Sequence, residues 1–371
     1  MMSARFLTVV LERAFNMRDG FGREIDYMRI SVIDSCNLNC YYCNPCDNNE
    51  HCHALNILSV KEVLCIVRAA TRLGIKHFRL TGGEPLLHPQ LDEMVLQIKK
   101  IPGVSSVSLT TNAVLLVQHA KWLKEACIDS INVSLDTIDA SEYERITKKP
   151  LLEEVKHGIN AAIECGIRVK INVVLTPQTD VVALTRYVAK KGTDIRFIEM
   201  MPVGEGHTNG VEPYKKVIGT LSKLYGEPCR INTEKTKEIN SGNDKRKIPD
   251  NGPAEYYIFP ELGIRVGLIQ AIHGKFCDTC NRIRVTADGR LMPCLGSSVT
   301  MDLVPDSWDF ADDVEKDFAI VRALRAAIKA KPRCHNFNDN AVTYTKTTET
   351  KTTEIEAAEV NAARNMSRIG G

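Results

Sequence analysis

The chain has 371 residues and a mass of 41.3 kDa, with 44% hydrophobic and 25% charged residues. These values are close to the average for globular proteins and exclude collagen-like, coiled-coil and wholly disordered chains. The 48 Lys and Arg residues offset 46 Asp and Glu residues to a formal charge of +2, so the bulk charge does not indicate a nucleic-acid-binding protein, and any anion site must be local.

Short apolar and β-branched runs alternate with amphipathic stretches from residue 27 to residue 199. The runs are nearly continuous in apolar residues or alternate weakly, as expected for strands covered on both faces. They predict strands at 27–33, 77–81, 106–111, 130–135, 169–175 and 194–200. The stretches between them predict helices at about 59–73, 90–100, 116–126, 141–147, 153–165 and 180–191. Helix signals agree, because Ser59 and Glu62 form a capping box and Gly74 and Gly166 follow two helices.

Six strand–helix units in succession predict a parallel sheet with right-handed crossovers. The predicted fold is therefore α/β, an incomplete (β/α)6 barrel of the TIM type with a C-terminal extension. In barrels of this kind, functional groups gather at the carboxyl ends of the strands. Those ends carry cysteines 36–43, the TGGEP segment at 81–85, residues 110–112, Ser134 with Asp136, and residues 199–201. We expect these groups to converge on one rim.

The regular alternation stops after Gly204, which suggests three regions. Residues 1–202 are expected to form the partial barrel, 203–253 a linker or insertion, and 254–371 a C-terminal region with a flexible tail. The last region contains two predicted β-hairpins, at residues 256–269 and 282–294, and Asp288 and Gly289 are expected to form the turn of the second. An amphipathic helix is expected at about 313–330, before a tail rich in Thr and charge.

The N-terminal residues lack a signal peptide, because the apolar run at 6–11 is short and is followed at once by Glu12 and Arg13. No stretch approaches the roughly 18 uninterrupted apolar residues of a membrane span. We therefore expect a cytoplasmic protein. Thiols stay reduced in that compartment, where cysteine clusters more often bind metal than form disulfides.

Two groups stand out among the 13 cysteines. Cys36, Cys40 and Cys43 form a C-x3-C-x2-C run, and Cys277, Cys280 and Cys294 form C-x2-C-x13-C, with the second predicted hairpin returning Cys294 to its partners. Three thiolates can hold three corners of a [4Fe–4S] cluster and leave the fourth iron open to a substrate or cofactor. The alternative is zinc, for which neither run supplies an obvious fourth ligand. Four further residues could complete a zinc site beside the first group: Cys46, Cys52, His51 and His53. Three other cysteines fall in helical patterns and are expected in the core: Cys65, Cys127 and Cys165.

Four segments together resemble the GTP 3′,8-cyclase (MoaA) family of molybdenum cofactor biosynthesis, which belongs to the radical S-adenosylmethionine (SAM) superfamily. These segments are CNLNCYYC (36–43), TGGEP (81–85), FCDTCNRIRVTADGRLMPCL (276–295) and RNMSRIGG (364–371). The first two identify only the superfamily, whereas the second cysteine group and the terminal Gly-Gly narrow the resemblance to this family. Ser35 and Asn44 depart from residues common in the family, but neither position supplies a ligand.

The resemblance implies roles for individual residues. It implies that Cys36, Cys40 and Cys43 hold a [4Fe–4S] cluster whose open iron binds SAM, and that Cys277, Cys280 and Cys294 hold a second one that binds the guanine base. It matches SAM contacts to Tyr42, Gly82, Gly83, Glu84, Thr110, Ser134 and Met201, the glycines permitting close approach of a ligand to the backbone. It matches GTP contacts to Arg29, Arg79, Lys170, Arg282 and Arg284, whose charges suit a triphosphate. It assigns Gly370 and Gly371 a part in hydrogen abstraction.

The resemblance further implies a lyase that converts GTP into (8S)-3′,8-cyclo-7,8-dihydroguanosine 5′-triphosphate. It implies a MoaC-type cyclic pyranopterin monophosphate synthase downstream, a reductant of the flavodoxin or ferredoxin type, and a homodimer, with neither nucleic acid nor membrane as a partner. Two other functions remain open from the residues. One is another radical SAM enzyme with an auxiliary cluster, such as a peptide-modifying maturase, and the other is a non-catalytic zinc-binding module.

Overall fold

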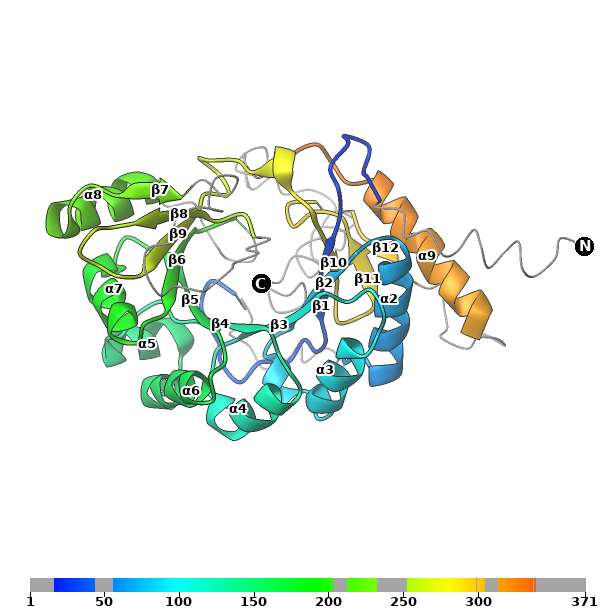
Figure 1. Ribbon diagram of the computed structural model, residues 1–371, viewed down its shortest axis with the longest axis horizontal. Coiled ribbons are helices and arrows are strands. Elements are labelled where there is room, and N and C mark those ends of the chain that lie inside the picture. The colour runs from blue at the N-terminus through cyan, green and yellow to red at the C-terminus, as the bar shows by residue number, and fades with distance from the viewer. Residues whose placement is uncertain are drawn as a thin grey trace, which may run out of the picture.

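The computed structural model describes residues 17–43, 56–202, 212–231, 252–297, 299–303, 313–335 and 337. Within these residues one sheet contains twelve strands in the order β12-β11-β10-β1-β2-β3-β4-β5-β6-β9-β8-β7. Figure 1 shows this sheet curved into an open arc, with helices along its outer side. No helix in the described ranges is long and apolar enough to span a membrane.

Six consecutive strands pair in parallel and form the centre of the arc. They are β1 (Tyr27–Ser31), β2 (His77–Thr81), β3 (Ser106–Thr111), β4 (Ser130–Ser134), β5 (Val169–Leu175) and β6 (Asp194–Glu199). The helices of this part are α2 (Val60–Arg72), α3 (Leu91–Lys99), α4 (Leu116–Glu125), α5 (Ala140–Thr147), α6 (Leu152–Glu164) and α7 (Val181–Lys190). The incomplete α/β barrel predicted from the sequence is thus confirmed, and the element boundaries differ from the prediction by at most two residues.

Local signals in the sequence account for where the helices begin and end. The Ser59 side chain accepts a hydrogen bond from the Glu62 backbone, and the Glu62 carboxylate accepts one from the Ser59 backbone, which completes the predicted capping box of α2. Gly74 and Gly166 follow α2 and α6 with φ angles of 86° and 69°. These left-handed conformations favour glycine and end both helices.

The C-terminal half of the chain adds strands to both edges of the central six. β10 (Arg282–Val285) pairs in parallel with β1, and β9 (Arg265–Ile269) pairs in parallel with β6. The outer strands are antiparallel: β8 (Glu255–Ile258) and β7 (Cys229–Ile231) on one edge, β11 (Arg290–Met292) and β12 (Met301–Asp302) on the other. Both predicted hairpins are confirmed as β8–β9 and β10–β11.

The range 203–253, expected as a linker or insertion, contributes regular structure where it is described. It holds α8 (Pro213–Tyr225), which starts at a proline in its first turn, and the edge strand β7. The apolar residues Val217, Ile218 and Leu221 of α8 are buried in the main core. The sequence therefore contains the apolar periodicity of an amphipathic helix here. The glycine-rich and polar stretches on either side made this helix difficult to predict.

Helix α9 (Asp313–Lys329) lies beside α2 on the outer side of the arc (Figure 1). Its apolar residues Ile320, Leu324 and Ile328 are fully buried in the main core. Asp317 of α9 forms an ion pair with Arg72 of α2 at 2.8 Å. After α9 the chain turns back toward the inner side of the sheet, where Lys331, His335 and Phe337 line the cavity described below.

The sequence predicts that three cysteines outside the two groups lie in the hydrophobic core. Cys65 is buried there and Cys165 packs against it, as predicted. The prediction for Cys127 is wrong, because this residue is exposed in the turn after α4 with a φ angle of 59°. Cys46, Cys52, His51 and His53 lie outside the described residues.

Candidate active site

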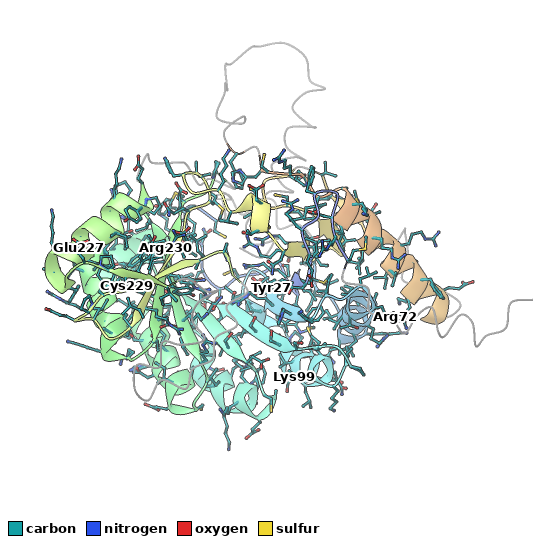
Figure 2. All side chains as sticks on the ribbon, turned by 45° about the horizontal axis from the view of Figure 1, so that its top comes forward. Tyr27, Arg72, Lys99, Glu227, Cys229 and Arg230 are labelled. Atoms are coloured by element: carbon teal, nitrogen blue, oxygen red, sulfur yellow. The ribbon has the colours of Figure 1, made fainter. Side chains whose placement is uncertain are left out.

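A cavity of about 600 Å³ occupies the inner side of the curved sheet. Figure 2 places Tyr27 at this inner side, whereas Arg72 and Lys99 lie on the outer helices and Cys229 and Arg230 at the far edge. The cavity wall includes all six cysteines of the two groups and the five basic residues matched to GTP contacts. The volume is within the usual range for sites that bind small molecules.

The cavity is lined by alternate residues of the strands. In β1, Tyr27 and Arg29 face the cavity, while Met28 and Ile30 are fully buried against the helices. The expectation that each strand is covered on both faces is therefore wrong for the inner face of β1, which lines the cavity. Barrel interiors are normally filled by side chains, and here polar inner residues surround an open space instead.

The first cysteine group occupies the loop after β1. This loop is attached to the end of α5, since the backbone N–H of Asn39 donates to the Thr147 carbonyl at 3.0 Å and that of Tyr41 to the Ile146 carbonyl at 3.1 Å. The Tyr42 hydroxyl donates a hydrogen bond to the Asp136 carboxylate beyond the end of β4. The loop is thus held from two elements of the barrel.

Gly82 and Gly83 lie directly against the chain segment that leads into this loop. A Cβ atom on Gly83 would stand 2.2 Å from the Ser35 carbonyl oxygen, and one on Gly82 would stand 2.4 Å from that of Ile33. The Gly83 N–H donates to the Ile33 carbonyl at 2.7 Å. Both glycines line the cavity, but the close approach that requires them here is that of the chain's own backbone, not only that of a ligand.

Glu84, expected among the SAM contacts, does not line the cavity. Its buried carboxylate accepts hydrogen bonds from the Leu86 N–H at 2.9 Å, the Thr111 hydroxyl at 2.7 Å and the Asn112 N–H at 2.7 Å. Burial raises the pKa of Glu84 to about 7. The residue therefore joins the TGGEP segment to the end of β3, behind the cavity wall. The other residues matched to SAM do line the cavity: Tyr42, Thr110, Ser134 and Met201.

The second cysteine group lies on the opposite side of the cavity. Cys277 begins a single 3-10 turn, Cys280 follows it, and the β10–β11 hairpin returns the chain to Cys294. The guanidinium of Arg282 donates to the Cys280 sulfur at 3.8 Å. Burial alone would raise the pKa of the Cys280 thiol, but the charges of Arg282 and Lys331 lower this pKa to about 6. The surroundings therefore favour a thiolate, the form that binds metal.

Strand register aligns three arginines across the sheet. Arg29 of β1 is directly opposite Arg284 of β10 on one side and Arg79 of β2 on the other. Burial, and then the charge of Arg282, lower the pKa of Arg284 to about 10. Like charges on directly opposite residues destabilise a sheet. The cavity thus has a strongly cationic wall, which an anionic ligand would stabilise.

Comparison with known proteins identifies the family. Residues 30–183 match the model of the radical SAM superfamily, and residues 193–337 match that of molybdenum cofactor synthesis C. A protein of Clostridium perfringens (strain SM101) named GTP 3′,8-cyclase is 35% identical over 324 residues, covering 86% of this chain and 95% of that protein. The chain belongs to the GTP 3′,8-cyclase family. A protein of the same name from Pelotomaculum thermopropionicum is 36% identical over 86% of this chain and 95% of its own length.

The fold has parallels outside the GTP 3′,8-cyclase family. The crystal structure of Streptococcus suis SuiB superposes with a TM-score of 0.52 over 81% of this chain and 65% of SuiB, at 16% identity. At this identity the likeness concerns the fold alone.

The donor atoms suit the iron–sulfur clusters of this family. Each cysteine group presents three free thiols to one cavity. Among the described residues, no three His, Cys, Asp or Glu side chains are arranged around a single metal ion. The thiolates of a [4Fe–4S] cluster bind separate irons and therefore stand further apart than the ligands of one ion. Three thiolate ligands per group would leave one iron of a [4Fe–4S] cluster without a protein ligand.

The cavity wall also contains residues for which the sequence predicts no functional role. Arg196 of β6 lines it and donates from Nε to the Asn172 side chain at 2.9 Å. Side chains alternate between the two faces along β6, and this alternation places Arg196 on the inner face. Because the barrel interior is open, a side chain on that face lines the cavity. Lys331 and His335 line the cavity too, and they follow α9 without a motif that would have identified them. Gly370 and Gly371 lie outside the described residues.

Proposed function

We propose that this chain is a radical SAM GTP 3′,8-cyclase, the lyase that forms (8S)-3′,8-cyclo-7,8-dihydroguanosine 5′-triphosphate in the first step of molybdenum cofactor biosynthesis. The observation that carries the proposal is the 35% identity to proteins of that name across 86% of the chain. It is supported by two cysteine groups and a cationic wall on one cavity. This membership decides against the peptide-modifying maturase and the zinc-binding module.

The enzyme uses SAM and two [4Fe–4S] clusters. We propose that Cys36, Cys40 and Cys43 hold the cluster that binds SAM, and that Cys277, Cys280 and Cys294 hold the cluster that binds the guanine base. When bound, SAM and its cluster would supply the hydrogen-abstracting 5′-deoxyadenosyl radical for the closure of C3′ of GTP onto C8 of the base, a cyclisation that also takes up one electron from the reductant and one proton. The protein's contribution is to place the two reactants together and exclude water.

The proposed SAM site is formed where β1 to β4 end. Thr110, Ser134 and Met201 would contact SAM from the ends of β3 and β4 and from the segment after β6, and Tyr42 from the cysteine loop. Gly82 and Gly83 keep that loop close to the sheet. We assign Glu84 to positioning, since its carboxylate accepts its hydrogen bonds behind the cavity wall.

The proposed triphosphate site is the cationic wall. Arginine offers a planar fork of donors to phosphate oxygens, and lysine a compact charge. The Lys170 ammonium lies 5.8 Å from the centre of the Tyr256 ring, across the inner face from the row of arginines. The substrate anion would relieve the repulsion among these cations, of which Lys170 and Arg284 are buried. The residues are Arg29, Arg79, Lys170, Arg282 and Arg284.

We further propose that Gly370 and Gly371 assist hydrogen abstraction, on the resemblance alone. A chain without the last two residues is expected to bind SAM normally and to lose cyclisation. Equal loss of SAM binding and cyclisation would assign the tail to folding.

The pathway implies partners that we also propose: a MoaC-type cyclic pyranopterin monophosphate synthase that consumes the product, a flavodoxin- or ferredoxin-type reductant, and a second copy of the chain in a homodimer. We propose that the enzyme works in the cytoplasm. Sedimentation of the reconstituted enzyme tests the dimer, and coupled conversion by a MoaC-type enzyme tests the product's fate.

The decisive experiment is an anaerobic assay of the reconstituted chain with SAM, GTP and dithionite, with the product identified by mass. Reconstitution should give about eight irons per chain, as two four-iron clusters require. Stoichiometric zinc without sulfide, or SAM cleavage without consumption of GTP, would refute the proposed function.

A further inference from the structure

Lys331 bridges the two backbone segments that carry Cys280 and Cys294. Its Nζ donates to the Arg282 carbonyl at 2.8 Å and to the Pro293 carbonyl at 2.8 Å. Arg282 is two residues after Cys280, and Pro293 directly precedes Cys294. The residue is 3% exposed and lines the cavity.

A second buried cation, Arg23, holds the remaining cysteine. Its Nη1 donates to the Cys277 carbonyl at 2.7 Å and to the Arg333 carbonyl at 2.8 Å, and its Nη2 to the Pro332 carbonyl at 2.6 Å. Arg23 has a buried counter-ion, since its Nε pairs with the Asp19 carboxylate at 2.5 Å. The segment after α9 is therefore fixed against all parts of the second cysteine group.

Lys331 differs from Arg23 in its counter-charge. Within the described residues, no carboxylate lies within ion-pair distance of the Lys331 ammonium, whose hydrogen-bond acceptors are neutral carbonyls. A buried charge without an opposite charge is costly. Its two hydrogen bonds place the Lys331 ammonium between the backbone segments that carry Cys280 and Cys294. The nearby anion that suits this ammonium is thus the second cysteine group in its metal-bound form.

We propose that Lys331 is a positioning residue of the second cluster site and the counter-charge of the cluster held there, and that it raises the reduction potential of that cluster. The inference rests on the proposed function, because it takes the second group to bind a [4Fe–4S] cluster. Reduction adds one negative charge to the cluster, so a fixed positive charge beside it stabilises the reduced form. The two hydrogen bonds of Lys331 join the backbone segment that carries Cys280 to the segment that carries Cys294.

The test uses the full chain, reconstituted anaerobically, as wild type and as Lys331→Met, Lys331→Arg and Lys331→Gln variants. Iron per chain and the reduction potential of each cluster are measured, with SAM added to mark the first cluster by its changed electron paramagnetic resonance spectrum. In the Met and Gln variants the ratio of reduced to oxidised second cluster should fall on the order of tenfold at fixed ambient potential, about 59 mV for one electron. The Arg variant should keep the potential near that of wild type.

Lys216 offers a matched control on α8. Its Nζ likewise donates to two carbonyls, those of Thr176 at 2.6 Å and Pro177 at 3.0 Å. Lys216→Met removes the same type of bonds away from the second cysteine group. It should leave the potential of the second cluster unchanged.

Each outcome decides the inference. The inference would be overturned if the Met and Gln variants kept eight irons and an unchanged reduction potential of the second cluster. It would also be overturned if the Arg variant lost the second cluster together with the Met and Gln variants. Loss of about four irons in the Met and Gln variants, with retention in the Arg variant and intact SAM cleavage, would support it. A wild-type chain that binds no second cluster would instead refute the proposed function, so the two failures are distinguishable.

Discussion

The Tyr42 hydroxyl donates a hydrogen bond to the Asp136 carboxylate, which joins the first cysteine loop to the segment after β4. The other Asp136 oxygen accepts the Val174 N–H of β5 at 2.7 Å. Burial raises the pKa of Asp136 to about 6, while burial and the Asp136 charge raise the pKa of Tyr42. One tyrosine therefore connects the first cysteine loop, through Asp136, to the segment after β4 and to β5.

Replacing Tyr42 by Phe tests this connection. The change leaves a buried carboxylate oxygen without its donor, a loss of about 1.5–3 kcal/mol. We expect SAM to bind about tenfold more weakly, measured by anaerobic equilibrium dialysis, with four irons retained in the first cluster. Tyr187→Phe is the control, because the buried Tyr187 hydroxyl has no hydrogen-bond partner among the described residues. Similar SAM affinity in both variants would contradict the role of Tyr42.

Gly83→Ala should displace the same loop. The new Cβ would stand 2.2 Å from the Ser35 carbonyl oxygen, so the backbone must shift at a cost of roughly 1–3 kcal/mol. We expect loss of the first cluster and of reductive SAM cleavage, measured by iron content and by release of 5′-deoxyadenosine. Gly219→Ala in α8 is the control, since a Cβ there would meet nothing within 4 Å and should stabilise the helix by about 1 kcal/mol. A Gly83 variant with full iron content and SAM cleavage would refute the steric argument.

The barrel and the cysteine hairpin were predictable because they depend on local order. Strand and helix periods, the Ser59 capping box and the Asp288-Gly289 turn are all encoded within a few residues of where they act. The alignment of Arg29 with Arg79 and Arg284 was not predictable in the same way, because it depends on the register of three strands far apart in the sequence. Lys331 acts through backbone carbonyls 49 and 38 residues away, a relationship with no local pattern.

Cys294→Ala is expected to separate the two halves of the reaction. The variant lacks one ligand of the proposed second cluster while the first group stays intact. Iron should fall from about eight to about four per chain, GTP turnover should disappear, and reductive SAM cleavage should continue in part. The exposed Cys229 on β7 provides the control, and Cys229→Ala should keep all three properties. Unchanged cyclisation in the Cys294 variant would rule out the assignment.

Arg284→Met should weaken substrate binding yet stabilise the free enzyme. Arg284 is buried directly opposite Arg29. Burial and the charge of Arg282 lower the pKa of Arg284 to about 10, so the positive charge of Arg284 destabilises the folded chain. We expect the dissociation constant for GTP to rise at least tenfold, SAM affinity to stay constant, and the thermal midpoint without GTP to rise. Arg290→Met in the same hairpin removes a cation that pairs with Asp302 at 3.1 Å and serves as the control. A lower midpoint for the Arg284 variant would contradict the electrostatic argument.

Glu84→Gln should remove a pH dependence of stability. Burial raises the pKa of Glu84 from 4.5 to about 7. Between these values the folded chain binds a proton that the unfolded chain has released, so the free energy of unfolding falls as the pH rises, by up to about 3 kcal/mol at 1.36 kcal/mol per pKa unit. Glutamine does not titrate and adds only a constant offset, so the difference in urea midpoint, wild type minus variant, should decrease from pH 5 to pH 8. The exposed Glu227 is the control, and a difference that stays constant from pH 5 to pH 8 would show that Glu84 is ionised throughout this range.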